Sequence, residues 1–314
     1  MTYHKPVLLR EAVQQLQPRS GGLYVDCTIG GGGHAEGVLR VSAPDGRLIG
    51  LDCDEEAVAA SRERLREFGT RVQVVRANFV ELESVLMNLG VTTVDAVLFD
   101  LGVSSRQFDE PSRGFSFQRE GPLDMRMDRQ LGASARDVLR SASLEELAQI
   151  FFTYGEERRA RAIARRIVDE RQRNPIETTT QLALLIQRVL GPKRGRIHPA
   201  TRVFQALRIV VNNELENLKR GLAAAVRALK PGGRIAVISF HSLEDRIVKR
   251  FFMEQSRGES PTLQLVTRKP ITPSQEETSA NPRARSAKLR VAEKLFVGSG
   301  EVWGAARRPA PQKI

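Results

Sequence analysis

The chain contains four consecutive glycines, which follow a short apolar run and lead into a helical pattern. Residues 25–34 read VDCTIGGGGH. A turn from strand to helix without Cβ atoms lets backbone N–H groups approach a ligand, next to the positive end of the helix. The next strand-like run, residues 47–52, ends on Asp52, at the spacing of about 20 residues where a carboxylate meets ribose hydroxyls in a βαβ unit. These two features predict a parallel α/β sheet with a nucleoside pocket, although a glycine-rich turn can also be a structural bend alone.

The order of the glycines narrows the choice of ligand. A dinucleotide fingerprint has glycine at the sixth position of G-x-G-x-x-G, where this chain has Ala35, so a nicotinamide-dependent oxidoreductase is disfavoured. The residues from Asp26 to Gly32 instead match D-x-T-x-G-x-G, which resembles motif I of S-adenosylmethionine-dependent methyltransferases. Such a cofactor carries a cationic sulfonium in place of a pyrophosphate, so an acid beside the glycines is acceptable.

Apolar runs alternate with amphipathic helical patterns on both sides of a long break in the chain. Strands are predicted at 23–27, 47–52, 71–76, 95–100, 234–240, 263–267 and 287–291. This alternation predicts an α/β fold with a doubly wound, mostly parallel Rossmann-like methyltransferase sheet. The last two strands form an antiparallel edge hairpin, and the segment between them, rich in Pro, Ser and Glu, is expected to be a mobile loop.

The break in the alternation predicts an inserted α-helical domain. Helical patterns cover 143–152, 156–173 and 178–190 without a convincing strand among them, and a helix at 213–229 followed by a KPGG turn at 230–233 restores the alternation. We therefore expect an S-adenosylmethionine-binding domain made of residues 1–104 and 212–314. Residues 105–211 form the inserted domain, with a role in recognising RNA or another substrate.

The carboxyl ends of the predicted parallel strands meet at one edge of the sheet, where ligands of such sheets bind. Asp52 is placed there to accept hydrogen bonds from ribose, and Phe79 is either an apolar face for adenine or a core aromatic. Asp100 opens the loop DLGVSSRQ at the position where amine methyltransferases carry an Asp/Asn/Ser-Pro-Pro-aromatic signature, and both prolines and the aromatic are missing. Asp100 can orient the N–H bonds of an exocyclic amine. A ring that stacks on the target base would then come from elsewhere, for example from Phe115 or Phe117.

Several longer runs resemble the bacterial family of 16S ribosomal RNA (cytosine-N4)-methyltransferases, and together they span nearly the entire chain. They are DLGVSS at 100–105, RGFSF at 113–117, GPLDMRMD at 121–128, YGEER at 154–158, HPATR at 198–202, SFHSLEDR at 239–246 and NPRAR at 281–285. The resemblance implies S-adenosylmethionine as the methyl donor. It also implies a cytidine in the decoding region of 16S rRNA, within the small ribosomal subunit, as the acceptor.

Candidate site residues follow from the motifs and from this resemblance. The residues expected at the donor are Gly30, Gly32, Gly33, His34, Asp52, Phe79, Asp100 and Gln107, the last of them taken from the family. The residues expected to act in catalysis are Asp100, Ser104 and His241. His241 is either a proton relay or a hydrogen-bond partner that fixes its loop. No metal is expected, because methyl transfer to nitrogen needs none and the acids Asp124 and Asp128 look like partners of Arg126.

The formal net charge of +12 suits a protein that binds a polyanion. Arginines concentrate at 156–173, in a Gly/Pro loop at 193–202 and at 283–290. The residues expected to bind RNA are Arg158, Arg165, Arg194, Arg196, Arg202, Arg283 and Arg285. A solvated helix with internal ion pairs would show a similar pattern, so this assignment depends on the presence of three separate clusters.

Two other functions remain open on the sequence alone. One is a non-catalytic ribosome assembly factor that binds S-adenosylmethionine, and the other is a DNA amine methyltransferase. The sequence has no signal-peptide pattern and no uncharged run of the roughly 20 residues that a membrane span needs, so a cytoplasmic protein without a membrane partner is expected. The two cysteines, Cys27 and Cys53, fit small apolar positions in a reducing compartment.

Overall fold

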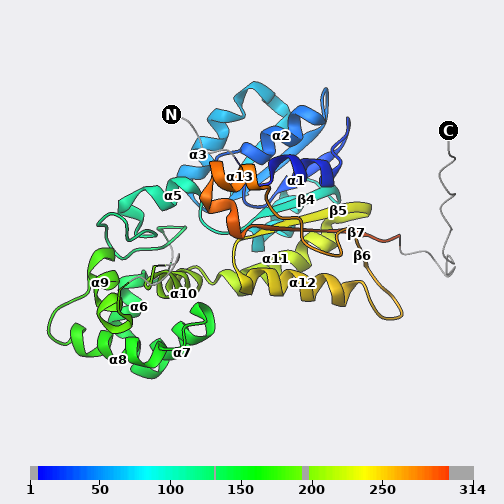
Figure 1. Cartoon of the computed structure of the whole chain (residues 1–314). Coiled ribbons are helices and arrows are strands. Elements are labelled where there is room, and N and C mark those ends of the chain that lie inside the picture. The colour runs from blue at the N-terminus through cyan, green and yellow to red at the C-terminus, as the bar shows by residue number, and fades with distance from the viewer. Residues whose placement is uncertain (1–5, 131, 193–197, 297–314) are drawn as a thin grey trace.

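The computed structural model describes residues 6–130, 132–192 and 198–296, and its centre is a seven-stranded sheet (Figure 1). The strand order is β3-β2-β1-β4-β5-β7-β6. The strands are β1 (Leu23–Asp26), β2 (Arg47–Asp52), β3 (Val72–Arg76), β4 (Val94–Asp100), β5 (Leu229–Ser239), β6 (Leu263–Leu265) and β7 (Lys288–Lys294). The first five run parallel, and β7 pairs antiparallel with both β5 and β6. The predicted doubly wound, mostly parallel sheet with an antiparallel edge is confirmed.

Helices cover both faces of this sheet, as parallel strands require. The helices of the sheet region are α1 (Leu9–Leu16), α2 (Gly33–Val41), α3 (Glu55–Arg64), η1 (Arg66–Arg71), η2 (Phe79–Glu81), α4 (Leu82–Asn88), α11 (Glu214–Ala228), α12 (Ser242–Gln255), α13 (Gln275–Ala280) and η4 (Pro282–Ser286). On β4, Val97 and Phe99 pack against α4, α11 and α12, whereas Ala96 and Leu98 pack against α1 and α2. Alternate side chains of one strand thus enter two separate cores, because successive residues of a strand point to opposite faces.

The described residues between β4 and α11, here called the insertion, pack around a hydrophobic core of their own beside the sheet region (Figure 1). Its helices are α5 (Ser105–Asp109), η3 (Pro111–Arg113), α6 (Ala135–Ser141), α7 (Leu144–Gly155), α8 (Ala160–Arg171), α9 (Thr179–Leu190) and α10 (Thr201–Val211). Phe151, Ile163 and Leu207 are fully buried where α7, α8 and α10 meet. Among the described residues, none of these or the other helices is both long enough and apolar enough to cross a membrane.

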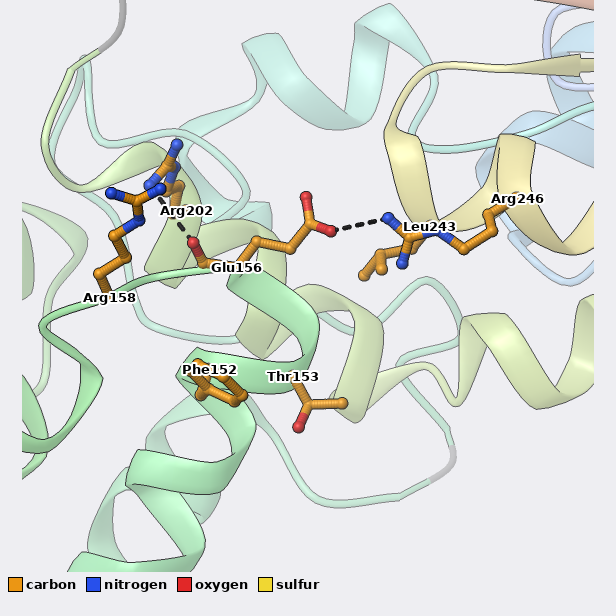
Figure 2. A pocket seen from close by; sticks show the side chains of 7 residues that line it. All are labelled: Phe152, Thr153, Glu156, Arg158, Arg202, Leu243 and Arg246. Carbon is orange, nitrogen blue, oxygen red and sulfur yellow. Dashed lines mark hydrogen bonds and ion pairs between the residues drawn. The ribbon is translucent and has the colours of Figure 1, made fainter.

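Glu156 joins the insertion to the sheet region (Figure 2). It follows α7 in the left-handed conformation, with φ of 50°. Its Oε2 accepts a hydrogen bond from Ser242 Oγ at 2.9 Å, and its Oε1 lies 3.0 Å from Arg246 Nη2. Both partners belong to the first turns of α12, so the end of α7 is fixed against that helix.

Two segments that were expected to be a turn and a loop form regular secondary structure. The KPGG residues at 230–233 lie inside β5, whose pairing with β4 shifts register there, so the predicted turn is a strand irregularity. The segment expected to be a mobile loop between the last two strands contains α13 and η4. Ser274 caps α13, and Glu277 accepts a hydrogen bond from the backbone N–H of Leu8 at 2.8 Å, which ties this segment to the N-terminal part of the chain.

Candidate functional site

The glycine turn lies at the carboxyl ends of β1, β2 and β4, where the strand order changes direction. Gly30 and Gly32 have φ angles of +50° and +79°, the left-handed region that glycine enters at the least cost. The Gly30 N–H donates to Asp52 Oδ2 at 3.0 Å, and the Asp100 N–H donates to Thr28 Oγ1 at 2.6 Å. The structure therefore brings together the glycines, Asp52 and Asp100, which lie far apart in the sequence.

His34, in the first turn of α2, links the glycine turn to Asp100. Its Nε2 lies 3.0 Å from the carbonyl oxygen of Val7, and its Nδ1 lies 3.4 Å from Asp100 Oδ2. A carbonyl oxygen only accepts, so Nε2 carries the hydrogen of the neutral ring, and Nδ1 then directs its lone pair toward Oδ2, where the two atoms can hold one added proton between them. Within the described part of the chain, the buried Asp100 Oδ1 has no hydrogen-bond partner. Asp100 thus has an oxygen without a hydrogen-bond donor at the edge of the sheet where β1, β2 and β4 end, here called the crevice.

Burial at this edge of the sheet changes the protonation of several groups. It raises the pKa of Asp26 to about 7 and that of Asp100 to about 7, and it raises the pKa of Asp52 to about 6. Burial lowers the pKa of His34, although the nearby Asp26 carboxylate acts in the opposite direction. A cation that binds beside these poorly solvated carboxyl groups lowers their pKa values and so favours their ionised forms.

The residues at the crevice fit a cationic nucleoside such as S-adenosylmethionine. A Cβ on Gly30 would meet only the Thr28 carbonyl oxygen, at 3.8 Å, so the backbone is open there, and the Asp52 oxygens each have a lone pair left after accepting one backbone N–H. Phe79 begins η2 after β3 and meets Phe99 edge-on at 5.5 Å between ring centroids. The half-buried Phe79 ring is therefore held by the core while one part stays accessible.

Gln107 and Ser104 form a capping box at the start of α5. Ser104 Oγ accepts from the Gln107 N–H, and Gln107 Oε1 accepts from the Ser104 N–H at 2.8 Å. The Gln107 amide also donates to Asp54 Oδ2 at 2.6 Å. Gln107 is buried, and through Asp54 its side chain supports the loop after β2.

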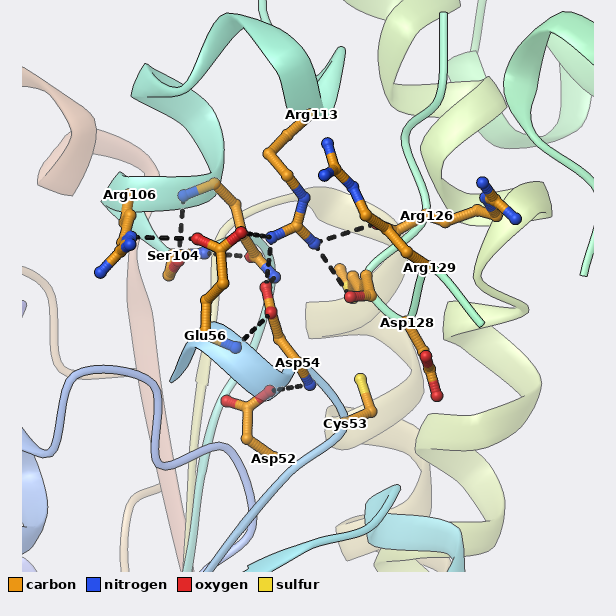
Figure 3. Close-up of polar contacts among 12 residues, drawn as sticks. Asp52, Cys53, Asp54, Glu56, Ser104, Arg106, Arg113, Arg126, Asp128 and Arg129 are labelled. Atoms are coloured by element: carbon orange, nitrogen blue, oxygen red, sulfur yellow. Dashed lines mark hydrogen bonds and ion pairs between the residues drawn. The ribbon is translucent and has the colours of Figure 1, made fainter. Parts of the chain in front are cut away.

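Asp54 and Arg113 are functional candidates that the sequence reasoning missed (Figure 3). Arg113 is 2% exposed, and its Nη1 lies 2.6 Å from Asp54 Oδ2. Its Nη2 donates to the carbonyl oxygens of Arg126 and Met127. The pair joins the loop after Asp52 to the insertion. The RGFSF run contains Arg113, yet no local pattern indicates that this arginine is buried.

His241 is the N-cap of α12, where its Nδ1 accepts from the Glu244 N–H at 3.4 Å. Its buried Nε2 lies 3.1 Å from Glu244 Oε1 without the direction of a hydrogen bond. Glu214 lies beside these two residues, and the atoms of Glu214, His241 and Glu244 that could bind a metal ion lie within 4.8 Å of one another. Arg208 donates twice to Glu214 at 2.8 Å and lies 3.8 Å from Glu244, so a guanidinium supplies the positive charge at this cluster.

The predicted RNA-binding arginines lie in different settings. Arg158 and Arg165 are exposed on and before α8, and Arg285 is exposed in η4. Arg202 lies in the first turn of α10 and not in a loop as expected, because a helix begins directly after the HPA run. Arg283 pairs with Asp109 and lies over the Phe108 ring at 4.7 Å. Two further predictions, Arg194 and Arg196, lie outside the described residues.

The loop residues considered for stacking and for ion pairing are engaged within the insertion. Phe115 is buried, and Phe117 packs against His198 and Phe204. Asp124 pairs with Arg126, as expected, at 2.7 Å. Asp128, however, pairs with Arg76 at 3.0 Å, because β3 ends beside this loop.

Comparison with known proteins gives a consistent family. The model of the MraW methylase family matches residues 1–295. The chain is 52% identical over 307 residues to the ribosomal RNA small subunit methyltransferase H of Thermomicrobium roseum, covering 94% of each chain. It is 53% identical over 309 residues to the protein of the same name from Trichlorobacter lovleyi, covering 93% of this chain and 98% of the relative. Among solved structures, an rRNA methylase from Streptococcus thermophilus is 10% identical with a TM-score of 0.41, covering 92% of this chain and 94% of that chain.

Proposed function

Because this chain belongs to the MraW methylase family of S-adenosylmethionine-dependent methyltransferases, we propose that it methylates the exocyclic N4 of a cytidine in 16S rRNA. The acceptor cytidine lies in the decoding region, and the substrate is the small ribosomal subunit. The relatives at about half identity carry the name of small-subunit rRNA methyltransferases, which supports this substrate. The net charge of +12 supports a polyanionic partner.

We assign donor binding and rRNA recognition to different parts of the chain. The sheet region, residues 1–104 and 212–314, binds the donor, and the insertion, residues 105–211, recognises the rRNA. The protein acts in the cytoplasm. The insertion has its own hydrophobic core and carries the exposed Arg158 and Arg165. No metal takes part in this proposal.

The observation that carries the proposal is the buried, unpartnered Asp100 Oδ1 beside the glycine turn. Bound S-adenosylmethionine supplies a methyl group that its positively charged sulfur activates. The Asp100 carboxylate, whose side chain is 27% exposed, accepts an N–H of the cytosine amine, which orients the nitrogen and reduces its conjugation with the ring. The pKa of Asp100, about 7, suits a group that takes up the proton the amine loses, and His34 Nδ1 at 3.4 Å can share it.

An Asp100→Asn variant tests this assignment, because an amide keeps the shape of the side chain but cannot take up the proton. We expect methyl transfer to small subunits that lack the modification to fall by orders of magnitude, while the variant folds normally. If transfer is unchanged, Asp100 is not the acceptor group. If wild-type protein binds the donor but transfers no methyl group to subunits, the assembly-factor alternative applies, and transfer to DNA in place of subunits would favour a DNA amine methyltransferase.

A further inference from the structure

A groove of about 770 Å³ lies between the insertion and the start of α12 (Figure 2). The insertion contributes Phe152, Glu156, Arg158 and Arg202, and α12 contributes Leu243 and Arg246. The groove therefore has one wall from each part of the protein. Its floor is fixed by the contacts of Glu156 with Ser242 and Arg246.

Phe152 presents an unusually exposed aromatic ring in this groove. Its side chain is 61% exposed, whereas the preceding Phe151 is fully buried in the core of the insertion. The buried face of α7 carries Leu147, Phe151 and Gly155, and Phe152 lies outside that face, so its ring can contact a ligand. Proteins that bind single-stranded nucleic acid use such rings as stacking platforms beside basic side chains.

The charge of the groove favours an anionic ligand. Three arginines and one glutamate are among its lining residues. The glutamate, Glu156, is already paired with Arg246, and its carbonyl oxygen accepts a hydrogen bond from Arg202 Nη1 at 3.3 Å. Lys249 and Arg250 follow Arg246 by three and four residues along α12 and are also exposed. Residues at this spacing lie on the same helix face, so the positive surface continues along α12.

The α12 wall of the groove is connected through the end of β5 to the loop after Asp100. Leu243 in its wall comes two residues after His241, which caps α12 directly behind β5. The Phe240 ring follows the same strand and lies 3.8 Å from the position that a Cβ atom on Gly102 would occupy. Gly102 follows Asp100 by two residues, so the loop that carries this carboxylate packs against the strand end from which α12 leads to the groove.

We propose that this groove binds the unpaired rRNA nucleotides next to the target cytidine, with one base stacked on Phe152 and its phosphates against Arg158, Arg202 and Arg246. This inference rests on the proposed function. A cytidine that enters the crevice leaves its stack and uncovers the face of its neighbour. The Phe152 ring replaces the missing stacking partner, and the arginines neutralise the backbone on either side.

The test measures KM and kcat for small subunits lacking the modification, with saturating S-adenosylmethionine. Phe152→Ala raises KM for subunits about fivefold or more, the effect of removing one stacked base, and leaves the affinity for the donor unchanged. Phe152→Tyr restores the wild-type KM, because it restores an aromatic face. The matched control is Leu184→Ala, which removes a 55% exposed apolar side chain from α9 of the same insertion and leaves KM unchanged.

A charge variant tests the positive surface that continues from the groove along α12. Arg250→Glu raises KM for subunits and weakens its dependence on salt, whereas Arg66→Glu, in η1 before β3 at the opposite edge of the sheet, changes neither. Ultraviolet cross-linking of the wild-type complex should join the peptide containing Phe152 to nucleotides adjacent to the methylated cytidine.

Three results would overturn the inference: a KM for Phe152→Ala equal to that of Leu184→Ala, a KM for Arg250→Glu equal to that of Arg66→Glu, or a cross-link from Phe152 to a ribosomal protein. The proposed function fails in a different way, because wild-type protein would then form no N4-methylcytidine at all.

Discussion

At the scale of single residues, the buried Asp26 carboxyl group lowers the stability of the free protein at neutral and higher pH. Its pKa rises from 3.8 to about 7 on folding, mainly through burial. The unfolded chain therefore loses this proton at lower pH than the folded protein does. The stability that the protonated form contributes is present below about pH 4 and is lost as the pH rises to about 7, by at most about 4 kcal/mol.

Asp26→Asn should remove this loss. We expect its melting temperature to match the wild type near pH 4 and to exceed it increasingly up to about pH 7, then by a constant margin. Thermal denaturation of the ligand-free protein at several pH values measures this. An Asp45→Asn variant serves as a control, because the pKa of that exposed carboxyl group is lowered by hydrogen bonds from Ser20 and Gly21. A difference for Asp26→Asn that shrinks with rising pH would contradict the account.

The same carboxyl groups make donor affinity depend on pH. A cationic sulfonium favours the ionised forms of Asp26, Asp52 and Asp100, whose pKa values lie at about 7, about 6 and about 7. Affinity for S-adenosylmethionine should therefore rise between about pH 5 and about pH 8, with release of protons on binding. Titration calorimetry in buffers of different ionisation enthalpy measures both. S-adenosylhomocysteine, whose sulfur is neutral, should show a weaker dependence, and equal dependence for the two ligands would be evidence against the carboxylate cluster.

At the scale of elements, the buried pair of Arg113 and Asp54 connects the loop after β2 to the insertion. Arg113→Met leaves the Asp54 carboxylate buried without its cation, which should cost about 3–5 kcal/mol of unfolding free energy in denaturant titrations. Arg129→Met is the matched control, since that arginine is 43% exposed.

Replacing both partners, Asp54→Asn with Arg113→Met, should recover much of this stability, because no unpaired charge remains. If Arg113→Met were as stable as Arg129→Met, the link would be unimportant for the fold.

Local patterns were sufficient to predict the sheet and the part of the site that lies at strand ends. The apolar runs, the glycine turn, Asp52 and Asp100 each follow from short stretches of sequence, and the topology then brings them together. The pair of Arg113 and Asp54 could not be predicted, because the partners are 59 residues apart and neither shows its burial locally. The short α6 was also missed, although Ser134 and Asp137 form a capping box that signals its start.

At the scale of the whole molecule, the proposed function assigns rRNA binding and donor binding to different surfaces. Arg158→Glu with Arg165→Glu should weaken binding to small subunits and flatten its salt dependence, by roughly one in the logarithmic slope for each phosphate that the arginines no longer neutralise. Donor affinity should not change, because both arginines belong to the insertion. Filter binding at several salt concentrations, with calorimetry for the donor, separates the two effects, and an equal decrease of both affinities would contradict this division.

The identity of the methylated atom tests the central claim most directly. Small subunits lacking the modification are incubated with the protein and isotopically labelled S-adenosylmethionine, and their rRNA is digested to nucleosides for mass spectrometry. The account predicts label in N4-methylcytidine from intact subunits. Label in another nucleoside or at another position of cytidine would contradict the assigned specificity, and the absence of label despite donor binding would contradict the assignment as an active methyltransferase.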